Sequence, residues 1–395
     1  MSMVHPTSAT PGARGCHGFD PERLARLGDA IRADLAAERY DGCEVVVGRG
    51  GTVAYHEHFG LADRARGRPV ERDQVFVTMS IAKQFTVALV LGRVERGDFA
   101  LTTPVAEVIP EFAARGKGRI TVAHLLTHTG GLPVLLPPLP AEQVGDLAAV
   151  VAATAACAPE CEPGARVGYC IIVAHAVMAE MVRRLDGGAR PYRQILEEDL
   201  FRPLGMRHTA LGARPDLAAR VAPVVARDRR VGLFDPAFLE ALAAALTPET
   251  EIPAGGGLST AADVHRFAEM LRGGGTLDGT RVLSSATIAL ARRSWTGTEP
   301  NSMWDYAVDL RGWPRFPANL GLGFFVRGTG MHPTPFGTLA SPETFGGFGA
   351  GSSVFWVDPV RDVTYAFLSS GLMEDTYSLE RHQRLSDVVH AAVLD

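Results

Sequence analysis

Ser80 and Lys83 stand three residues apart in an apolar stretch that reads Thr-Met-Ser-Ile-Ala-Lys-Gln-Phe over residues 78–85. On a helix, side chains at this spacing project from the same face. A serine hydroxyl is a poor nucleophile until a neighbouring base removes its proton. A lysine can be that base only when its pKa is lowered, and apolar neighbours lower it by desolvating the ammonium. The segment therefore predicts covalent serine chemistry without a Ser-His-Asp triad.

The same spacing also arises by chance on solvated helix faces, which is the alternative for Ser80 and Lys83. The composition of the segment favours chemistry, because a helix that only fills a core excludes lysine.

Metal binding has weaker support in the sequence. Cys157 and Cys161 are four residues apart, but no second Cys or His pair completes a zinc site. His124 and His128 have helical spacing without the glutamate of a zinc-protease helix. We expect no metal and no organic cofactor.

The composition describes a globular protein. The chain has 395 residues, 46% of them hydrophobic, and a net charge of -5, so it can bury a large core. It has no basic block suited to nucleic acid and no apolar run long enough for a membrane span. Residues 1–18 read as a flexible tail without a secretory signal, and the odd count of five cysteines fits reduced thiols, so we expect a cytoplasmic protein.

The elements that must hold Ser80 come from both ends of the chain. Asp20-Pro21 begins a helix, and two valine-rich runs around Gly48–Gly51 form a hairpin. Strands over 354–357 and 363–368 and a helix over 379–393 close the chain. The part between is mostly helical, with a strong helix over 171–185 and another over 261–271 capped by Ser259 or Thr260.

This order predicts an α/β (α+β) fold with an antiparallel sheet. Residues 19–100 and 273–395 would form the sheet domain, residues 101–272 a helical domain, and Ser80 would lie at their junction.

Over about residues 19–393 the chain resembles the serine β-lactamase and penicillin-binding-protein superfamily. It is most similar to the class C β-lactamase-like branch, which includes esterases, D-aminopeptidases and transacylases. The resemblance implies the β-lactamase/transpeptidase-like fold. The landmarks that carry it are Ser-Ile-Ala-Lys at 80–83, Ile-Thr-Val-Ala-His-Leu-Leu-Thr-His-Thr-Gly-Gly-Leu at 120–132, Pro-Gly at 163–164, Pro-Leu-Gly-Met at 203–206 and Gly-Gly-Leu-Ser-Thr-Ala-Ala-Asp at 256–263.

The second motif of that family, Tyr-x-Asn, falls on Tyr169-Cys170-Ile171. The resemblance implies that the Tyr169 oxygen lies near Ser80 and Lys83 and relays the serine proton to the leaving group. A lysine ammonium beside it would favour the phenolate. Ile171 replaces the asparagine, and its side chain can neither orient the lysine nor bind a substrate amide. The alternative for Tyr169 is a buried aromatic with a satisfied hydroxyl.

The third family motif, Lys-Thr-Gly or His-x-Gly, falls on Gly347-Phe348-Gly349. The cation that helps to hold a substrate carboxylate is absent, which disfavours penicillins and D-Ala-D-Ala peptides. Backbone N–H groups do not depend on side-chain identity, so those of Ser80 and Ala350 are the expected oxyanion hole. Trp304 and Tyr306 either line the acyl pocket or simply pack. The expected substrate-binding set is Ile171, Gly347, Phe348, Gly349, Trp304 and Tyr306.

The sequence therefore predicts an enzyme in which Ser80, Lys83 and Tyr169 transfer an acyl group from an ester, thioester or amide. Its partners would be a small-molecule acyl donor and water, an amine or an alcohol as acceptor, which leaves esterase, amidase and transacylase open. The altered motifs and the expected location suggest specialised metabolism, such as natural-product assembly. The alternative is a non-catalytic scaffold on the same fold.

Overall fold

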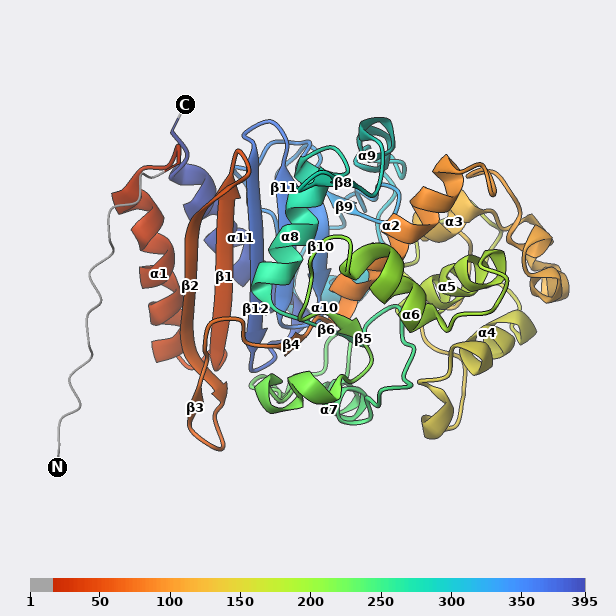
Figure 1. The fold of residues 1–395 in the computed structure, drawn as a ribbon, viewed down its shortest axis with the longest axis horizontal. Coiled ribbons are helices and arrows are strands. Elements are labelled where there is room, and N and C mark those ends of the chain that lie inside the picture. Colours follow the sequence, from red (N-terminus) through yellow and green to blue (C-terminus); the bar gives the residue numbers. More distant parts are fainter. Residues whose placement is uncertain (1–16, 395) are drawn as a thin grey trace.

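The computed structural model describes residues 17–394, and a seven-stranded sheet forms the centre of this part of the chain (Figure 1). All its paired neighbours run antiparallel, and the first strand pairs with the last, so both chain ends build the sheet as predicted. In sheet order the strands are β3 Arg68–Pro69, β2 Thr52–Asp63, β1 Gly42–Arg49, β12 Val363–Ser370, β11 Ser353–Asp358, β10 Phe345–Gly349 and β9 Phe325–Val326.

Helices cover both faces of the sheet, which explains why its central strands are apolar on both sides. Val45 and Val47 of β1 pack with α1 (Pro21–Ala36) and α11 (Asp375–Ala391), whereas Val46 between them joins the core on the opposite face. Helix α8 (Ala261–Arg272) lies across that opposite face, against β12, β11 and β1.

The helix ends follow the capping signals of the sequence. The Asp20 carboxylate accepts from the N–H groups of Glu22 and Arg23 at the start of α1. Thr260, one of the two expected caps, accepts from the Asp263 N–H at 3.1 Å. The last helix begins at Asp375, four residues before the predicted start, because the Glu374 side chain caps it.

The remaining helices gather mainly beyond one end of the sheet, on the right in Figure 1. Helix α5 (Val173–Leu185) matches the predicted helix 171–185 within two residues. The others are α2 Ala82–Glu95, α3 Val122–Leu126, α4 Leu147–Ala156, α6 Tyr192–Leu196, α7 Pro236–Ala244, α9 Ser285–Ala291 and α10 Asp305–Arg311.

Two observations bear on the predicted division of the chain. Helix α8 lies within the segment 101–272, for which the sequence predicts a helical domain, yet it packs on the sheet. Helix α2 is buried along most of its length and contacts α5 and α6, so it joins the sheet part to the helical part. A small sheet supports its start, with strands β4 Phe76–Val77, β6 Gly257–Ser259 and β5 Ala210–Leu211. The third sheet is the hairpin of β7 Thr276–Leu277 and β8 Thr280–Arg281.

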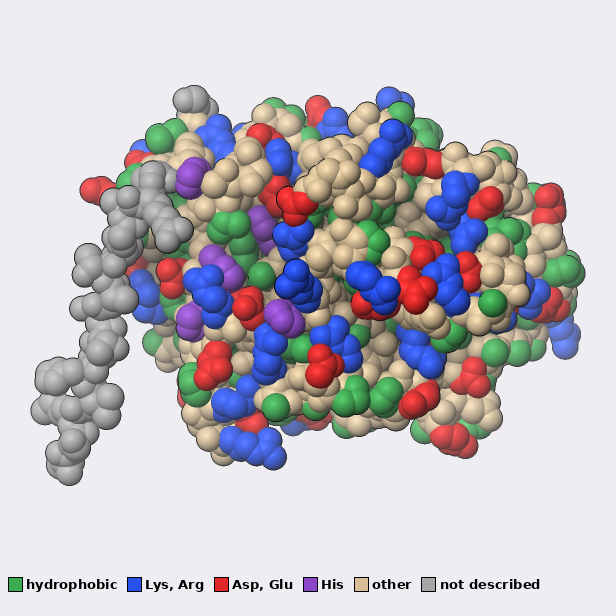
Figure 2. All heavy atoms as spheres, viewed as in Figure 1, with side chains coloured by type: hydrophobic (Ala, Val, Ile, Leu, Met, Phe, Trp, Pro, Cys, Tyr) green, Lys and Arg blue, Asp and Glu red, His purple; other side chains and the backbone are tan. Residues whose placement is uncertain are grey.

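The predicted tail over residues 1–18 falls almost entirely outside the described residues. In the described part, every helix is too short or too polar to cross a membrane. Figure 2 shows acidic and basic side chains interspersed over one face of the molecule.

Candidate active site

Ser80 lies at the centre of a short 3₁₀ turn, η1 (Met79–Ile81), that leads directly into α2. The sequence predicts a helix here, and the structure has a 3₁₀ turn at Ser80 followed by α2, which contains Lys83. Residues three apart lie on one face in both geometries. Met79 adopts a left-handed φ of 50°, a strained conformation for a residue with a side chain. The preceding Thr78 is fixed by its N–H to Gly257 O at 2.8 Å and by Ser353 Oγ, which donates to Thr78 O at 2.9 Å. The nucleophile is thus held by β6 and β11.

Lys83 is buried in the first turn of α2 and reaches back to the serine. Its Nζ lies 3.1 Å from Ser80 Oγ, 2.7 Å from Ile171 O and 2.8 Å from Ala254 O. The side chain is 1% exposed, and this burial lowers the pKa of Lys83 to about 7. A substantial fraction of the amine is therefore neutral near pH 7 and can accept the serine proton.

Position 171 takes part in holding the lysine, although its side chain does not. In the family motif this position is an asparagine, whose side chain the resemblance implies would orient the lysine. In the structure the backbone carbonyl of Ile171 is the acceptor at 2.7 Å from Lys83 Nζ. The Ile171 side chain offers the lysine no hydrogen bond, and the backbone of position 171 holds it instead.

Tyr169 lies beside this pair in a segment whose backbone is tightly held. Its N–H donates to Asn301 Oδ1 at 3.3 Å, the next N–H, of Cys170, donates to His128 Nδ1 at 3.0 Å, and that of Ile171 donates to Val134 O at 3.0 Å. Lys83 Nζ lies 5.1 Å from the centroid of the Tyr169 ring. Three consecutive backbone anchors thus fix the tyrosine against the Ser80–Lys83 pair.

The electrostatics of Tyr169 differ from the sequence expectation. Burial raises the pKa of its hydroxyl, and a hydrogen bond with Ser80 acts in the opposite direction. A lysine ammonium was expected to favour the phenolate, but burial disfavours the charged form of both groups. At neutral pH Tyr169 is therefore protonated, whereas Lys83 is partly neutral.

His128 and Asn301 are two supporting residues that the sequence analysis did not assign to the site. The His128 ring stacks on Tyr169 with centroids 4.5 Å apart, and its Nδ1 accepts from the Cys170 N–H. Burial, with Lys83 nearby, lowers the pKa of His128 to about 3, so the imidazole is neutral. The landmark at 120–132 contains His128 and could have marked it, whereas nothing in the sequence distinguishes Asn301.

The glycines of β10 allow that strand to lie directly against the nucleophile. A Cβ on Gly349 would lie 2.6 Å from Thr78 O and 2.7 Å from the Met79 Cβ, and one on Gly347 would lie 2.2 Å from Gln84 Oε1. Phe348 points to the opposite side and packs on Phe325, with ring centroids 4.6 Å apart. Gln84 thus occupies the space that a side chain at the third-motif position would enter.

Ala350 follows β10 in a turn and lines the same small cavity as Ser80. The turn is fixed by the Gly351 N–H, which donates to Asp375 Oδ1 at 3.0 Å. Burial, followed by repulsion from Glu374, raises the pKa of Asp375 to about 7. This arrangement is compatible with Ser80 and Ala350 N–H groups facing one oxyanion, a role that stays a prediction.

Trp304 and Tyr306 do not line the cavity beside Ser80. Trp304 stacks on Phe348 at 6.1 Å, and the Tyr306 hydroxyl donates to Glu374 Oε1 at 2.9 Å. Both belong to an aromatic group that reaches Tyr169 through Phe325. Their role in substrate binding stays a prediction, and it would apply to the part of the site next to Tyr169.

Residues of the types that bind metal ions do not form a cluster in the described part of the chain. Across residues 17–394, no three His, Cys, Asp or Glu side chains are placed to share a metal ion. Cys157, Cys161 and Cys170 are free thiols.

Comparison with known proteins places this geometry in a family. The sequence model of the family described as Beta-lactamase matches residues 27–389. Penicillin-binding protein 4 of Amycolatopsis lactamdurans is 34% identical over 242 residues, which are 60% of this chain and 61% of the relative. Esterase/beta-lactamase LipL of Mycobacterium tuberculosis is 26% identical over 388 residues, covering 92% of this chain and 84% of LipL. The chain thus spans less than two thirds of the first of these relatives.

Solved structures show the same architecture. A penicillin-binding protein homologue from Caulobacter crescentus superimposes with a TM-score of 0.79 at 27% identity, covering 95% of this chain and 99% of the homologue. The protein has a β-lactamase/transpeptidase-like fold, and the chain belongs to the Beta-lactamase family.

Proposed function

We propose that this protein is a serine acyl-transfer enzyme that forms an acyl-enzyme on Ser80 from a neutral ester of a small molecule. One observation carries the proposal: Lys83 Nζ lies 3.1 Å from Ser80 Oγ in a site whose burial lowers the pKa of Lys83 to about 7. A hydroxyl in contact with a buried, partly neutral amine is an activated nucleophile.

The reaction assigns one role to each residue. Ser80 Oγ attacks the carbonyl carbon, and Lys83 takes the hydroxyl proton. The Ser80 and Ala350 N–H groups stabilise the oxyanion. As the carbonyl re-forms, the C–O bond to the leaving group breaks and Tyr169 supplies its proton, which Lys83 replaces. Water or another nucleophile then attacks the acyl-enzyme, loses its proton to the same groups, and releases Ser80.

The altered third motif supports an ester over a β-lactam or a peptide with a free carboxylate. Gly347 carries no cation, and a side chain at this position would have to displace the end of the Gln84 side chain. A neutral acyl donor does not need such an anchor. The name of LipL, esterase/beta-lactamase, includes both activities and does not decide between them. Two altered motifs also support a specialised small-molecule substrate over a cell-wall peptide.

The test is intact-protein mass spectrometry after incubation with a fluorophosphonate and, separately, with p-nitrophenyl esters. Wild-type protein should gain one adduct, and Ser80→Ala should gain none and lose at least about 10⁴-fold in kcat. Adding amines and alcohols then distinguishes hydrolysis from transacylation by the products formed. Turnover that survives in Ser80→Ala would overturn the mechanism, and absence of any adduct or turnover would favour the scaffold alternative.

A further inference from the structure

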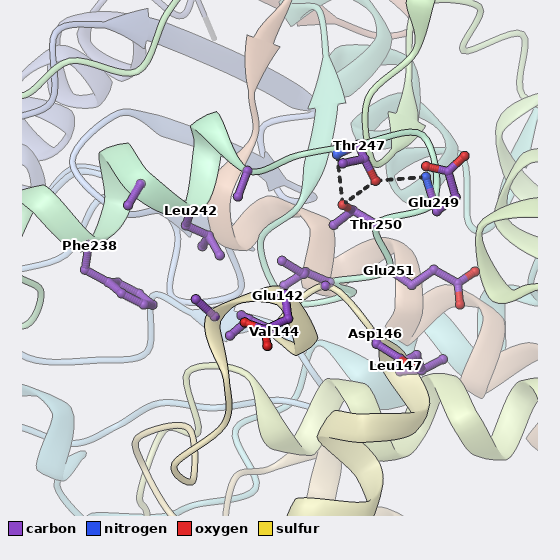
Figure 3. Close-up of a pocket in the computed structure, with 15 residues that line it drawn as sticks. Glu142, Val144, Asp146, Leu147, Phe238, Leu242, Thr247, Glu249, Thr250 and Glu251 are labelled. Atoms are coloured by element: carbon purple, nitrogen blue, oxygen red, sulfur yellow. Dashed lines mark hydrogen bonds between the residues drawn. The ribbon is translucent and has the colours of Figure 1, made fainter.

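Two cavities of very different size lie next to each other, and the smaller one adjoins Ser80. The cavity beside Ser80 has a volume of about 20 Å³. A second cavity of about 600 Å³ lies between helix α7 and the loop at residues 141–147, a loop that includes the 3₁₀ turn η4 (Ala141–Gln143) (Figure 3). The first has room for about one water molecule, whereas the second is in the usual range of ligand pockets.

The two cavities share a wall. Phe238 and Leu242 of α7, together with Ile252, line both of them. Ile252 also lies two residues before Ala254, whose carbonyl oxygen accepts a hydrogen bond from Lys83. An acyl group larger than a few atoms cannot fit beside Ser80, and the space directly across these three side chains is the second cavity.

The lining of the large cavity is mainly apolar. Val144 and Leu147 lie across the cavity from Leu242 and Phe238, and Ala141, Ala241 and Ala245 also line it. Thr247 and Thr250 bond to each other, with the Thr247 N–H donating to Thr250 Oγ1 at 2.9 Å. Such a lining favours a hydrocarbon chain.

The carboxylates around the cavity define which chains it would reject. Asp146 accepts from N–H groups at the start of α4, and Glu251 accepts from the Arg193 N–H at 2.8 Å. Glu142 and Glu249 are exposed at the rim. Their negative charges disfavour a chain that ends in a carboxylate.

We propose that this cavity is the subsite for a medium-length, uncharged apolar acyl chain, and that the substrates of Ser80 are esters of such acids. The inference rests on the proposed function and adds the class of acyl group. Movement of Phe238 or Leu242 would join the two spaces, and 40% of the Phe238 surface is exposed.

The test compares p-nitrophenyl esters from acetyl to decanoyl in two matched variants. Ala241 and Ala244 are both exposed on the same helix, but Ala241 lines the large cavity whereas Ala244 lines neither cavity. In wild-type protein kcat/KM should rise about threefold for each methylene that enters the cavity. Ala241→Trp should lower the ratio of octanoyl to acetyl kcat/KM about tenfold or more, and Ala244→Trp should leave that ratio at the wild-type value.

An acyl chain that ends in a carboxylate tests whether the negative charges at the rim of the cavity disfavour charged substrates. An eight-carbon p-nitrophenyl ester with a terminal carboxylate should react about tenfold more slowly than the octanoyl ester, and Glu142→Gln combined with Glu249→Gln should narrow that gap. A folded Ala241→Trp protein with an unchanged octanoyl-to-acetyl ratio would overturn the subsite while leaving the Ser80 mechanism intact. Absence of Ser80-dependent turnover with every ester would overturn the proposed function and, with it, this inference.

Discussion

The molecule buries two lysines in similar cages of carbonyl oxygens, and only one of them adjoins a nucleophile. Lys83 contacts Ile171 O, Ala254 O and Ser80 Oγ. Lys117 donates to Ala114 O at 2.7 Å, to Ala155 O at 2.8 Å and to Cys157 O. Burial lowers the pKa of both, to about 7 for Lys83.

The difference lies in the third partner. Ala155 and Cys157 are at the C-terminal end of α4, so Lys117 satisfies carbonyls that a helix end leaves free and meets its negative dipole. Lys83 contacts two carbonyl oxygens and the Ser80 hydroxyl, which can give up a proton, where Lys117 contacts three carbonyl oxygens. A buried lysine is therefore structural by default, and its neighbour decides whether it can be a base.

Replacing each lysine by methionine should give the largest difference in activity between the two positions. Lys83→Met should lower kcat for a p-nitrophenyl ester by about 10³-fold, because it removes the proton acceptor of Ser80. Lys117→Met should change kcat less than about twofold if it folds. Steady-state kinetics on both proteins, with circular dichroism as the folding control, makes the test. Equal losses in the two variants would show that lysine burial acts through stability alone.

Tyr169→Phe sharpens the account of the active lysine. Only the hydroxyl is lost, while the stacking on His128 and the backbone anchors are kept. We expect kcat to fall about 10²-fold for a poor leaving group such as an alkoxide, because that group needs a proton. The p-nitrophenolate leaving group needs none, so its ester should lose less in the acylation step. An equal loss for both esters would contradict a proton-donor role.

The antiparallel sheet built from both chain ends could be predicted, because apolar runs and helix caps are local signals, and motif spacing marked Ser80, Lys83 and Tyr169 as candidates. The carbonyl cage of Lys83 could not, since Ile171 and Ala254 supply backbone atoms that any residue carries. The start of α11 was missed because glutamate is not among the residues favoured at a helix N-cap, yet Glu374 caps this one. The direction of the Tyr169 pKa depends on burial, which the sequence around position 169 does not reveal.

The stabilities of the same methionine variants should differ in their dependence on pH. In the unfolded chain Lys83 keeps its proton up to about pH 10.4, whereas in the folded protein it loses it near pH 7. Between these values the unfolded state binds more protons, so raising the pH favours the folded state. From pH 7 to 9 the unfolding free energy of wild type should therefore gain about 2 kcal/mol relative to Lys83→Met, as measured by urea denaturation.

Lys117→Met provides the structural counterpart in that experiment. This variant leaves the carbonyls at the end of α4 without their donor, so its unfolding free energy should be about 1–3 kcal/mol below that of wild type at both pH values. A Lys83→Met protein whose stability follows that of wild type at every pH would contradict the lowered pKa of Lys83.

The pH dependence of the rate gives the smallest effect and the most direct view of the lysine. Only neutral Lys83 can accept the Ser80 proton, and its neutral fraction rises with pH through about 7. Log kcat/KM should therefore rise with a slope near one below pH 7 and level off above it, so that the rate at pH 6 is about tenfold below that at pH 8. Lys117→Met should keep the same inflection. A value of kcat/KM that does not change through pH 7 would show that a group other than Lys83 accepts the Ser80 proton. Lys83 and Lys117 would then both contribute only to the structure.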